Sequence, residues 1–238
     1  MRRRITRPTL LTGFSAALTV ASISATAGFL IGRYPMLRQF VPVHFDGQGL
    51  PNRWQLTSYL LVLMPVWIQI ALALTFGAIA GILLYRASPG DGERGEIAQP
   101  DADRMLVTAE AISLLAAIWV TFQGLAAVQL MSLWQRGWGG FGKIYGQTLV
   151  IAIVASVVVG IRAASSLRQS QPASLTADSN WRFRALYFNP QDPALFVPVR
   201  SGFGWTVNFG RPGAILLMML FLIFGIGAPL AIMRILLG

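Results

Sequence analysis

Five long apolar runs constrain this chain more than any other feature of its sequence. They cover Thr9–Gly32, Ser58–Tyr85, Met105–Ser132, Ile144–Ile161 and Pro212–Leu237. A helix needs about 20 mostly apolar residues to cross the hydrocarbon core of a bilayer. Backbone amides in lipid must be bonded within a helix or a closed barrel, and these runs lack the alternation of barrel strands. The sequence therefore predicts an all-α transmembrane helical bundle with five spans.

The overall composition agrees with a membrane protein. Apolar residues make up 55% of the chain and charged residues 12%, whereas soluble domains average about 45–50% and about 25%. The mean hydropathy is +0.60. These values exclude a disordered chain, a coiled coil and an ordinary water-soluble enzyme. The absence of cysteine excludes disulfides, thiolate metal sites and a cysteine nucleophile.

Lysine and arginine predict how the chain is oriented. The N-terminal tail and the second and fourth loops carry 13 of these residues, and the first and third loops carry 5. Because positive loops remain in the cytoplasm, we expect the N-terminus inside and the C-terminus outside. The net charge of +10 is spread along the membrane edges. Anionic lipid head groups are therefore the expected partner, and nucleic acid is not.

The first run has an alternative interpretation as a signal peptide. The basic stretch Met1–Arg7 precedes it, and Ala25, Thr26 and Ala27 form an A-x-A pattern typical of a cleavage site. The run of 24 residues is longer than the usual apolar region of about 7–15. We therefore favour an uncleaved anchor, with cleavage left open.

The pattern divides the chain into six segments. They are a two-helix membrane domain with an outside loop (1–85), an acidic flexible linker (86–104), a helical hairpin (105–162), a linker (163–180), a small β-rich cytoplasmic module in the fourth loop (181–211) and a last transmembrane helix (212–238). Alternating residues predict one short strand, Val41–Phe45, in the outside loop. The same reasoning predicts three in the module: Ala185–Asn189, Leu195–Val199 and Trp205–Phe209.

The outside loop holds the first group of candidate residues. His44 is the only histidine of the chain, and a metal site needs three or four ligands, so we expect no metal site and no catalytic base there. A structural hydrogen bond, or contact with a ligand or partner, is the expected role. The candidate ligand or partner loop comprises His44, Asp46, Gly49, Pro51, Arg53 and Trp54.

The third run contains its only internal carboxylate, Glu110. A small-polar stripe continues from Glu110 at helical spacing through Ser113, Ala117, Thr121 and Gly124, with Gln69, Gln123 and Gln147 as polar partners. This stripe predicts a helix-contact seam, with a proton, ion or ligand path as the alternative. We expect Glu110 and Gln123 to be the intramembrane polar residues.

Paired glycines form a separate and weaker pattern. Gly28 with Gly32, and Gly77 with Gly81, are G-x-x-x-G pairs, which permit close approach of helices.

Two groups of motifs resemble known bacterial families. Pro42-Val-His-Phe-Asp46, followed by Gly49, Pro51 and Trp54, resembles a membrane domain of unknown function that also forms the N-terminal part of SdpI-like proteins. Tyr187-Phe-Asn-Pro-Gln-Asp-Pro193, Val197–Arg200 and Gly204–Gly210 resemble a second uncharacterised module often found C-terminal to the first. The resemblance implies a bacterial cytoplasmic-membrane protein. The candidate residues of this module are Tyr187, Asn189, Asp192, Arg200, Trp205 and Asn208.

These observations favour a non-enzymatic sensor, regulatory or toxin-immunity-like protein of the bacterial envelope. We expect no cofactor, no metal and no catalytic residue. The expected partners are the lipid bilayer, a peptide or protein outside or at the inner surface, and a second copy of the chain. The alternative is a small transporter or ion-pathway component that uses Glu110 and the polar stripe.

Overall fold

Four long helices form the bundle in the part of the chain that the structure describes. This computed structural model describes residues 9–46, 50–87, 99–137, 143–169, 178–183, 186–191, 196–199 and 205–212, with 215 and 219. The long helices are α1 (Leu10–Arg33), α3 (Met64–Arg86), α4 (Gln99–Arg136) and α5 (Lys143–Gln169). Each contains a stretch long and apolar enough to cross a membrane. Four of the five predicted spans are therefore confirmed as helices long and apolar enough to cross a membrane, and most of the fifth lies outside the described residues.

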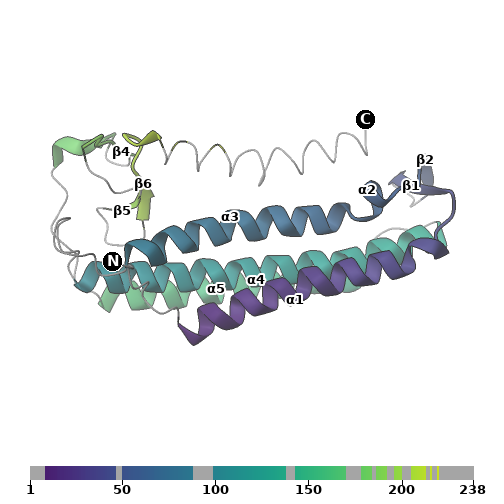
Figure 1. Cartoon of the computed structure of the whole chain (residues 1–238), viewed down its shortest axis with the longest axis horizontal. Helices are drawn as coiled ribbons and strands as arrows, with labels where there is room; N and C mark the ends of the chain where they lie inside the picture. The colour runs from purple at the N-terminus through teal and green to yellow at the C-terminus, as the bar shows by residue number, and fades with distance from the viewer. Residues whose placement is uncertain are drawn as a thin grey trace, which may run out of the picture.

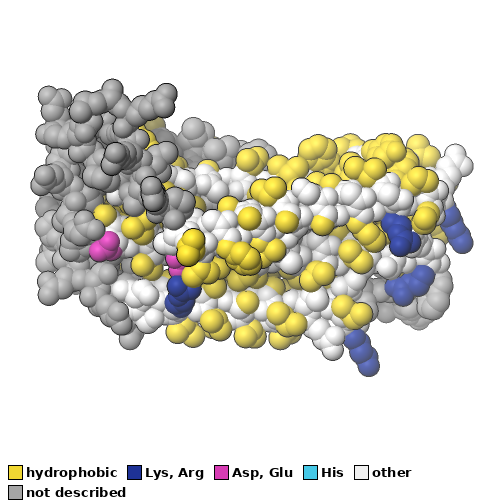
Figure 2. Space-filling view, turned by 60° about the horizontal axis from the view of Figure 1, so that its bottom comes forward, with side chains coloured by type: hydrophobic (Ala, Val, Ile, Leu, Met, Phe, Trp, Pro, Cys, Tyr) yellow, Lys and Arg dark blue, Asp and Glu magenta, His cyan; other side chains and the backbone are white. Residues whose placement is uncertain are grey.

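Helix α4 is the centre of the bundle. The helices α1, α3 and α5 each pack along α4, as Figure 1 shows. On the face that Figure 2 shows, hydrophobic side chains are spread along the length of the bundle, and the visible lysine and arginine side chains lie toward its ends. Exposed apolar sides and charged ends are the distribution expected of a bundle surrounded by lipid.

Helix starts follow from local capping. The Thr9 side chain accepts a hydrogen bond from the backbone N–H of Thr12 and so caps α1. Ser58 caps the short α2 (Tyr59–Val62) in the same way. The predicted second span is interrupted at Leu63, and α3 begins with Pro65 in its first turn, where proline is tolerated because its missing N–H has no partner to lose.

Two predicted linkers are shorter than expected. Helix α4 begins at Gln99, so the acidic linker 86–104 is helical over its last six residues. Pro100 in the first turn and the acidic residues that follow favour a helix start there. Helix α5 continues to Gln169, which makes the first part of the 163–180 linker helical.

A β-hairpin lies at one end of the bundle. A 3-10 turn, η1 (Tyr34–Met36), leads from α1 into strand β1 (Phe40–Phe45), which pairs antiparallel with β2 (Pro51–Leu56). The register shifts on both sides of His44. Strand β1 was predicted and β2 was not.

The second strand region lies at the opposite end of the bundle (Figure 1). The turn η2 (Asp178–Asn180) precedes β3 (Trp181–Arg182), which pairs with β4 (Leu186–Tyr187), while β5 (Phe196–Pro198) pairs with β6 (Trp205–Val207). A single bridge between Tyr187 and Asn208 joins the two pairs. Strands β4, β5 and β6 fall within the three predicted strands, and β3 was not predicted.

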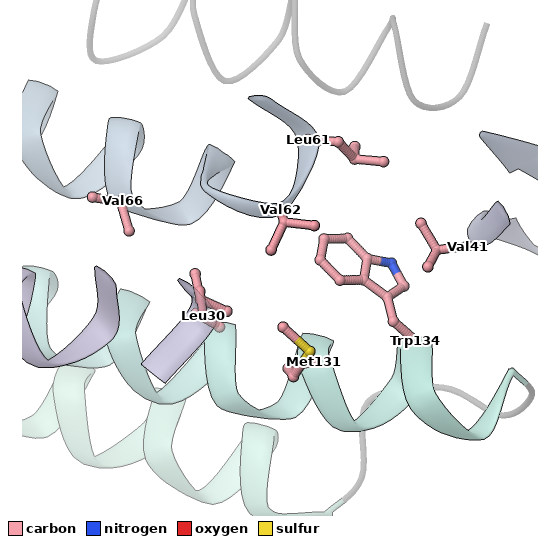
Figure 3. Packing of buried hydrophobic residues seen from close by; sticks show 8 residues of the cluster. Leu30, Val41, Leu61, Val62, Val66, Met131 and Trp134 are labelled. Carbon is pink, nitrogen blue, oxygen red and sulfur yellow. The ribbon is translucent and has the colours of Figure 1, made fainter. Parts of the chain in front are cut away.

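The largest buried cluster joins the β1–β2 hairpin to the bundle. Figure 3 shows the indole ring of Trp134, from the end of α4, between Val41 of the hairpin and Val62 of α2. Leu30 and Met131 close the cluster from α1 and α4. Val41, Val62 and Leu30 are completely buried, so the hairpin is part of the bundle's core rather than a loose loop.

The two glycine pairs do not mark helix contacts among the described residues. No described atom lies within 4 Å of a Cβ built on Gly28, Gly32, Gly77 or Gly81. The close approach occurs instead at Gly124, where a Cβ would lie 2.7 Å from the Oγ1 atom of Thr26.

Candidate functional site

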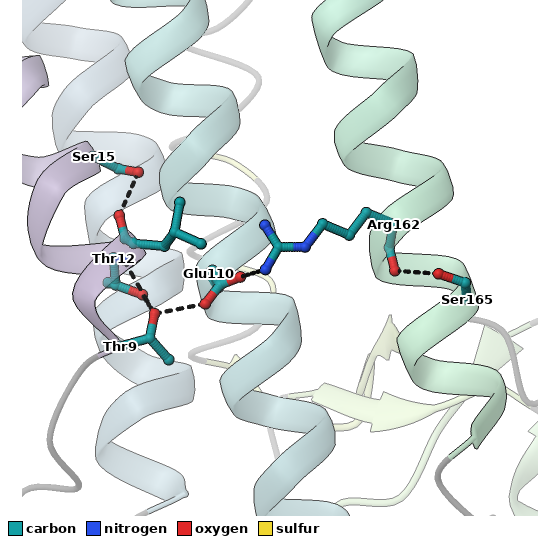
Figure 4. Close-up of polar contacts among 7 residues, drawn as sticks. Thr9, Thr12, Ser15, Glu110, Arg162 and Ser165 are labelled. Carbon is teal, nitrogen blue, oxygen red and sulfur yellow. Dashed lines mark hydrogen bonds and ion pairs between the residues drawn. The ribbon is translucent and has the colours of Figure 1, made fainter.

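Glu110 is the centre of a polar cluster that joins three helices. Its Oε2 accepts a hydrogen bond from the Thr9 hydroxyl at 2.6 Å, and its Oε1 accepts one from Arg162 Nη2 at 2.8 Å. Figure 4 shows the Arg162 side chain reaching from α5 to Glu110 on α4, with Thr9 approaching from the start of α1. The carboxylate therefore links α1, α4 and α5 at one end of the bundle.

The two partners of this ion pair differ in exposure. The Glu110 side chain is 15% exposed and that of Arg162 is 54% exposed. An ion pair at an exposed site contributes little, but a mostly buried carboxylate without a partner is costly. Arg162 thus stabilises the charge of Glu110 while keeping half of its own surface open.

The rest of the polar stripe is used for packing. Ser113 donates to the Ala109 carbonyl within α4, and Thr121 shares a 3.0 Å hydrogen bond with Ser22 of α1. Ala117 is 3% exposed, and Gln123 is half-buried. The contact between Thr121 and Ser22 joins this stripe to α1.

Gln69 is the most deeply buried polar side chain of the helices, with no exposed surface. Its Nε2 donates to Thr26 Oγ1 at 3.1 Å and to the Val120 carbonyl at 2.8 Å, joining α3 to α1 and α4. Among the described residues, its Oε1 has no hydrogen-bond partner. An unpaired buried amide oxygen costs about 1–3 kcal/mol.

The candidate residues of the β1–β2 hairpin mostly maintain its own shape. His44 Nδ1 forms a hydrogen bond with Asn52 Oδ1 across the strands. Asp46 Oδ1 accepts from the Leu50 N–H at 2.9 Å, and the Asp46 N–H donates to the Leu50 carbonyl at 2.9 Å. These contacts give His44 and Asp46 structural roles.

The other candidate residues of this loop differ in how exposed their side chains are. Pro51 and Arg53 are half-buried in β2, and Gly49 lies outside the described residues. Trp54 is 43% exposed, and Phe40 and Leu56 are 51% and 58% exposed. Phe40 pairs with Leu56, and Trp54 stands two residues before Leu56, so the three share one side of the hairpin. We call these three residues the hairpin face.

In the C-terminal module, Asn208 makes three hydrogen bonds to the backbone. Its Oδ1 accepts from the N–H groups of Asn189 and Gly210, both at 3.0 Å, and its Nδ2 donates to the Asn189 carbonyl at 2.9 Å. Asn208 has no exposed surface, and Tyr187 is 2% exposed. A Cβ on Gly210 would lie 2.6 Å from the Asn189 carbonyl carbon, so only glycine fits there.

These contacts explain several motif residues of the module without a ligand. Asn189 Oδ1 accepts from the Gln191 N–H at 3.0 Å, and Asn189 Nδ2 donates to the Tyr187 hydroxyl at 3.3 Å. Trp205 begins β6. Asp192 and Arg200 lie outside the described residues.

The described residues contain no group of three or more His, Asp or Glu side chains that could hold a metal ion. The sequence contains no cysteine to add to such a group.

Three residues outside the predicted sites prove central to the structure. Arg162 directly follows the apolar run Ile144–Ile161 and was not a candidate, yet it pairs with Glu110. Trp134 donates its indole N–H to the Pro42 carbonyl at 3.0 Å. Gln69 was named only as a polar partner of the stripe. Gln69 could have been selected from the sequence because it is a polar residue inside an apolar run. The sequence neighbours of Arg162 and Trp134 gave no indication of their partners.

A protein-family model matches the C-terminal part of the chain. The model of a family of unknown function (DUF5808) matches residues 190–215. This region overlaps the second module that the sequence motifs indicated, including β5, β6 and Asn208. No curated protein and no solved structure matches the chain.

Proposed function

We propose that this chain is a multi-pass protein of the bacterial cytoplasmic membrane that acts as a non-enzymatic sensor or regulator. Its N-terminus would lie inside, and its β1–β2 hairpin would meet a peptide or lipid component of the envelope. The excess of positive residues in alternate loops supports this orientation. The observation that carries the proposal is the hairpin face, an exposed apolar surface on a firmly held hairpin.

The attachment of the β1–β2 hairpin to α4 supports a role in signalling. Trp134 contacts the hairpin through its hydrogen bond to Pro42, and Glu110 lies on the same helix, 24 residues earlier. At 1.5 Å per residue the two positions are about 36 Å apart. A continuous helix thus joins the hairpin to the Glu110 cluster at the other end. A shift of the hairpin would move α4 and alter that cluster.

The packing of α1 supports an uncleaved first helix. Thr9 and Thr26 bond to Glu110 and Gln69, and Leu30 is completely buried in the core. Removal of the chain up to Ala27 would take away both polar contacts.

The test uses a photo-crosslinking amino acid at Trp54 in living cells, with the same residue at Leu74 as the control. Leu74 is 68% exposed on α3 and lies inside a candidate span. We expect a specific adduct from position 54 that Phe40→Ala or Leu56→Ala weakens. The deletion strain should show an envelope phenotype that Trp54→Ala does not rescue. Full rescue by Trp54→Ala would refute the role of the hairpin face.

A small transporter or ion-pathway component is the second candidate. The unpartnered Gln69 Oε1 at the centre of three helices favours it. The test is flux through the purified protein in liposomes, compared between the wild type and Glu110→Gln. Equal flux for the two proteins would remove this candidate.

A further inference from the structure

An apolar groove runs between α1 and α5 along the surface of α4. Its volume is about 310 Å³, at the lower end of the roughly 300–1,000 Å³ of ligand sites. It is lined by Phe14, Ser15, Leu18, Leu114, Ala117, Ile118, Thr121, Phe122, Leu125, Thr148, Ile151, Ala152 and Ala155. We call this the α1–α5 groove.

The groove offers almost no free polar group to an occupant. Only three of its residues carry a hydroxyl, and each hydroxyl already has a partner in the protein. Ser15 donates to the Leu11 carbonyl, Thr148 donates to carbonyls of its own helix, and Thr121 pairs with Ser22. An occupant therefore meets methyl, methylene and aromatic surface, which suits hydrocarbon and disfavours a polar solute.

An ion pair lies beyond one end of the groove. Glu110 precedes the lining residue Leu114 by four positions on α4, and Arg162 follows the lining residue Ala155 by seven on α5. These spacings return to the same helix face, and the rises are about 6 Å and about 10 Å. The Glu110–Arg162 pair therefore lies in line with the groove, at the end of the span that finishes at Ala163.

Arg162 retains capacity for an anion. The described contacts of its guanidinium use Nη2 on Glu110, whereas a guanidinium carries five N–H donors. Its side chain is 54% exposed. A phosphate next to Arg162 would accept hydrogen bonds from the N–H donors that Glu110 leaves unused.

We propose that the α1–α5 groove binds one acyl chain of an anionic glycerophospholipid whose phosphate contacts Arg162. The apolar lining of the groove suits the acyl chain of the lipid. The half-exposed guanidinium of Arg162 at the membrane surface favours an anionic head group. Basic sites between transmembrane helices at the cytoplasmic surface are suited to anionic lipids. This site is independent of the partner proposed for the hairpin face.

The experiment is native mass spectrometry of the purified full chain with added phosphatidylglycerol or phosphatidylcholine. We expect the wild type to retain one phosphatidylglycerol in preference to phosphatidylcholine. Arg162→Gln should lower that retention about fivefold, as expected for one lost arginine contact at the membrane surface. Lys143→Gln, which changes a charge at the opposite end of α5, is the matched control and should retain the lipid.

Two further variants separate lipid binding from a purely structural ion pair. Glu110→Gln also breaks the pair but removes a competing carboxylate, so it should retain phosphatidylglycerol at least as well as the wild type. A structural pair alone would make Glu110→Gln and Arg162→Gln lose lipid together, and that result overturns the proposal. The melting temperature of each variant is measured alongside, so that unfolding is recognised.

The groove itself is tested by filling it. Ala155→Phe should abolish retention, whereas Val158→Phe, on a side chain that is 58% exposed and outside the lining, should retain the lipid. Equal retention by Ala155→Phe and the wild type overturns the proposal. A dimer mass that Ala155→Phe removes would place a second copy in the groove instead. If the wild type retains no lipid and Ala155→Phe destabilises the protein, another segment of the chain occupies the groove. This result and the dimer result each overturn the proposal.

Discussion

The indole N–H of Trp134 donates a hydrogen bond to the Pro42 carbonyl oxygen, 92 residues earlier in the chain, at 3.0 Å. Trp134 is 3% exposed, so neither group has water as an alternative partner. This contact fixes the β1–β2 hairpin to the end of α4.

We predict that Trp134→Phe destabilises the protein by about 1–3 kcal/mol, because it leaves the Pro42 carbonyl buried without a donor. Hydrogen exchange should accelerate in β1 and β2 more than in α3. Trp67→Phe is the control, since Trp67 is 53% exposed. Unchanged exchange in the hairpin would show that apolar packing alone holds it.

We predict that Gly124→Ala destabilises the bundle by about 1–3 kcal/mol, the usual range for overpacking. The new methyl group would lie 2.7 Å from Thr26 Oγ1 and 3.2 Å from Gln69 Nε2. Gly81→Ala, which meets no described atom within 4 Å, should be neutral or stabilising. Thermal unfolding in detergent measures both, and equal melting temperatures would contradict the close approach at Gly124.

We predict that Gln69→Leu changes stability by less than about 1.5 kcal/mol, whereas Gln69→Ala costs about 2–5 kcal/mol. Leucine nearly fills the same space and removes the unpartnered Oε1. The Thr26 hydroxyl keeps its own bond to the Ser22 carbonyl. Thermal unfolding distinguishes the two variants. A larger loss for leucine than for alanine would show that the amide is needed for its polarity.

We predict that Asn208→Ala costs the C-terminal module at least about 2 kcal/mol, because three backbone groups lose their partner. Limited proteolysis should then cut the module faster, with the four long helices unaffected. Gln191→Ala is the control, because only the backbone N–H of Gln191 contacts Asn189. If Asn208→Ala resisted proteolysis as well as the wild type, the hydrogen bonds of Asn208 would not be what holds the module together.

We predict that single cysteines at Leu50 and Gln191 are labelled from opposite sides of the membrane. The β1–β2 hairpin and the module lie at opposite ends of the bundle (Figure 1), and the chain has no native cysteine to interfere. An impermeant thiol reagent should label Leu50→Cys in intact cells and Gln191→Cys only after permeabilisation. Labelling of both in intact cells would contradict the proposed orientation.

The helices were predictable because the signal for each is local. A run of about 20 apolar residues has one stable form in lipid, so four described spans follow from the sequence alone. Strand β2 was not predicted because Pro51 and Asn52 are poor strand formers. Its partner β1 is held by Val41, which packs in the same buried cluster as the distant Trp134.

The polar contacts were less predictable, because they join distant positions. Glu110 was conspicuous as the carboxylate inside a run, but its partner Arg162 is 52 residues away and resembled any basic residue at a span's end. His44 and Asn208 were selected as candidates by their chemistry. In the structure they hold a hairpin and a turn in shape, and for His44 a structural hydrogen bond is one of the two roles expected from the sequence.

The Glu110 cluster also has a consequence for the order in which the protein assembles. Thr9, Glu110 and Arg162 are synthesised in that order, and chains emerge from the N-terminus first. Until α5 has been made, Glu110 has the Thr9 hydroxyl as its partner but lacks the counter-charge of Arg162. The ion pair can therefore form only after α5 has been made, and a chain that ends before Arg162 would have the Thr9 hydroxyl, without the guanidinium, beside Glu110.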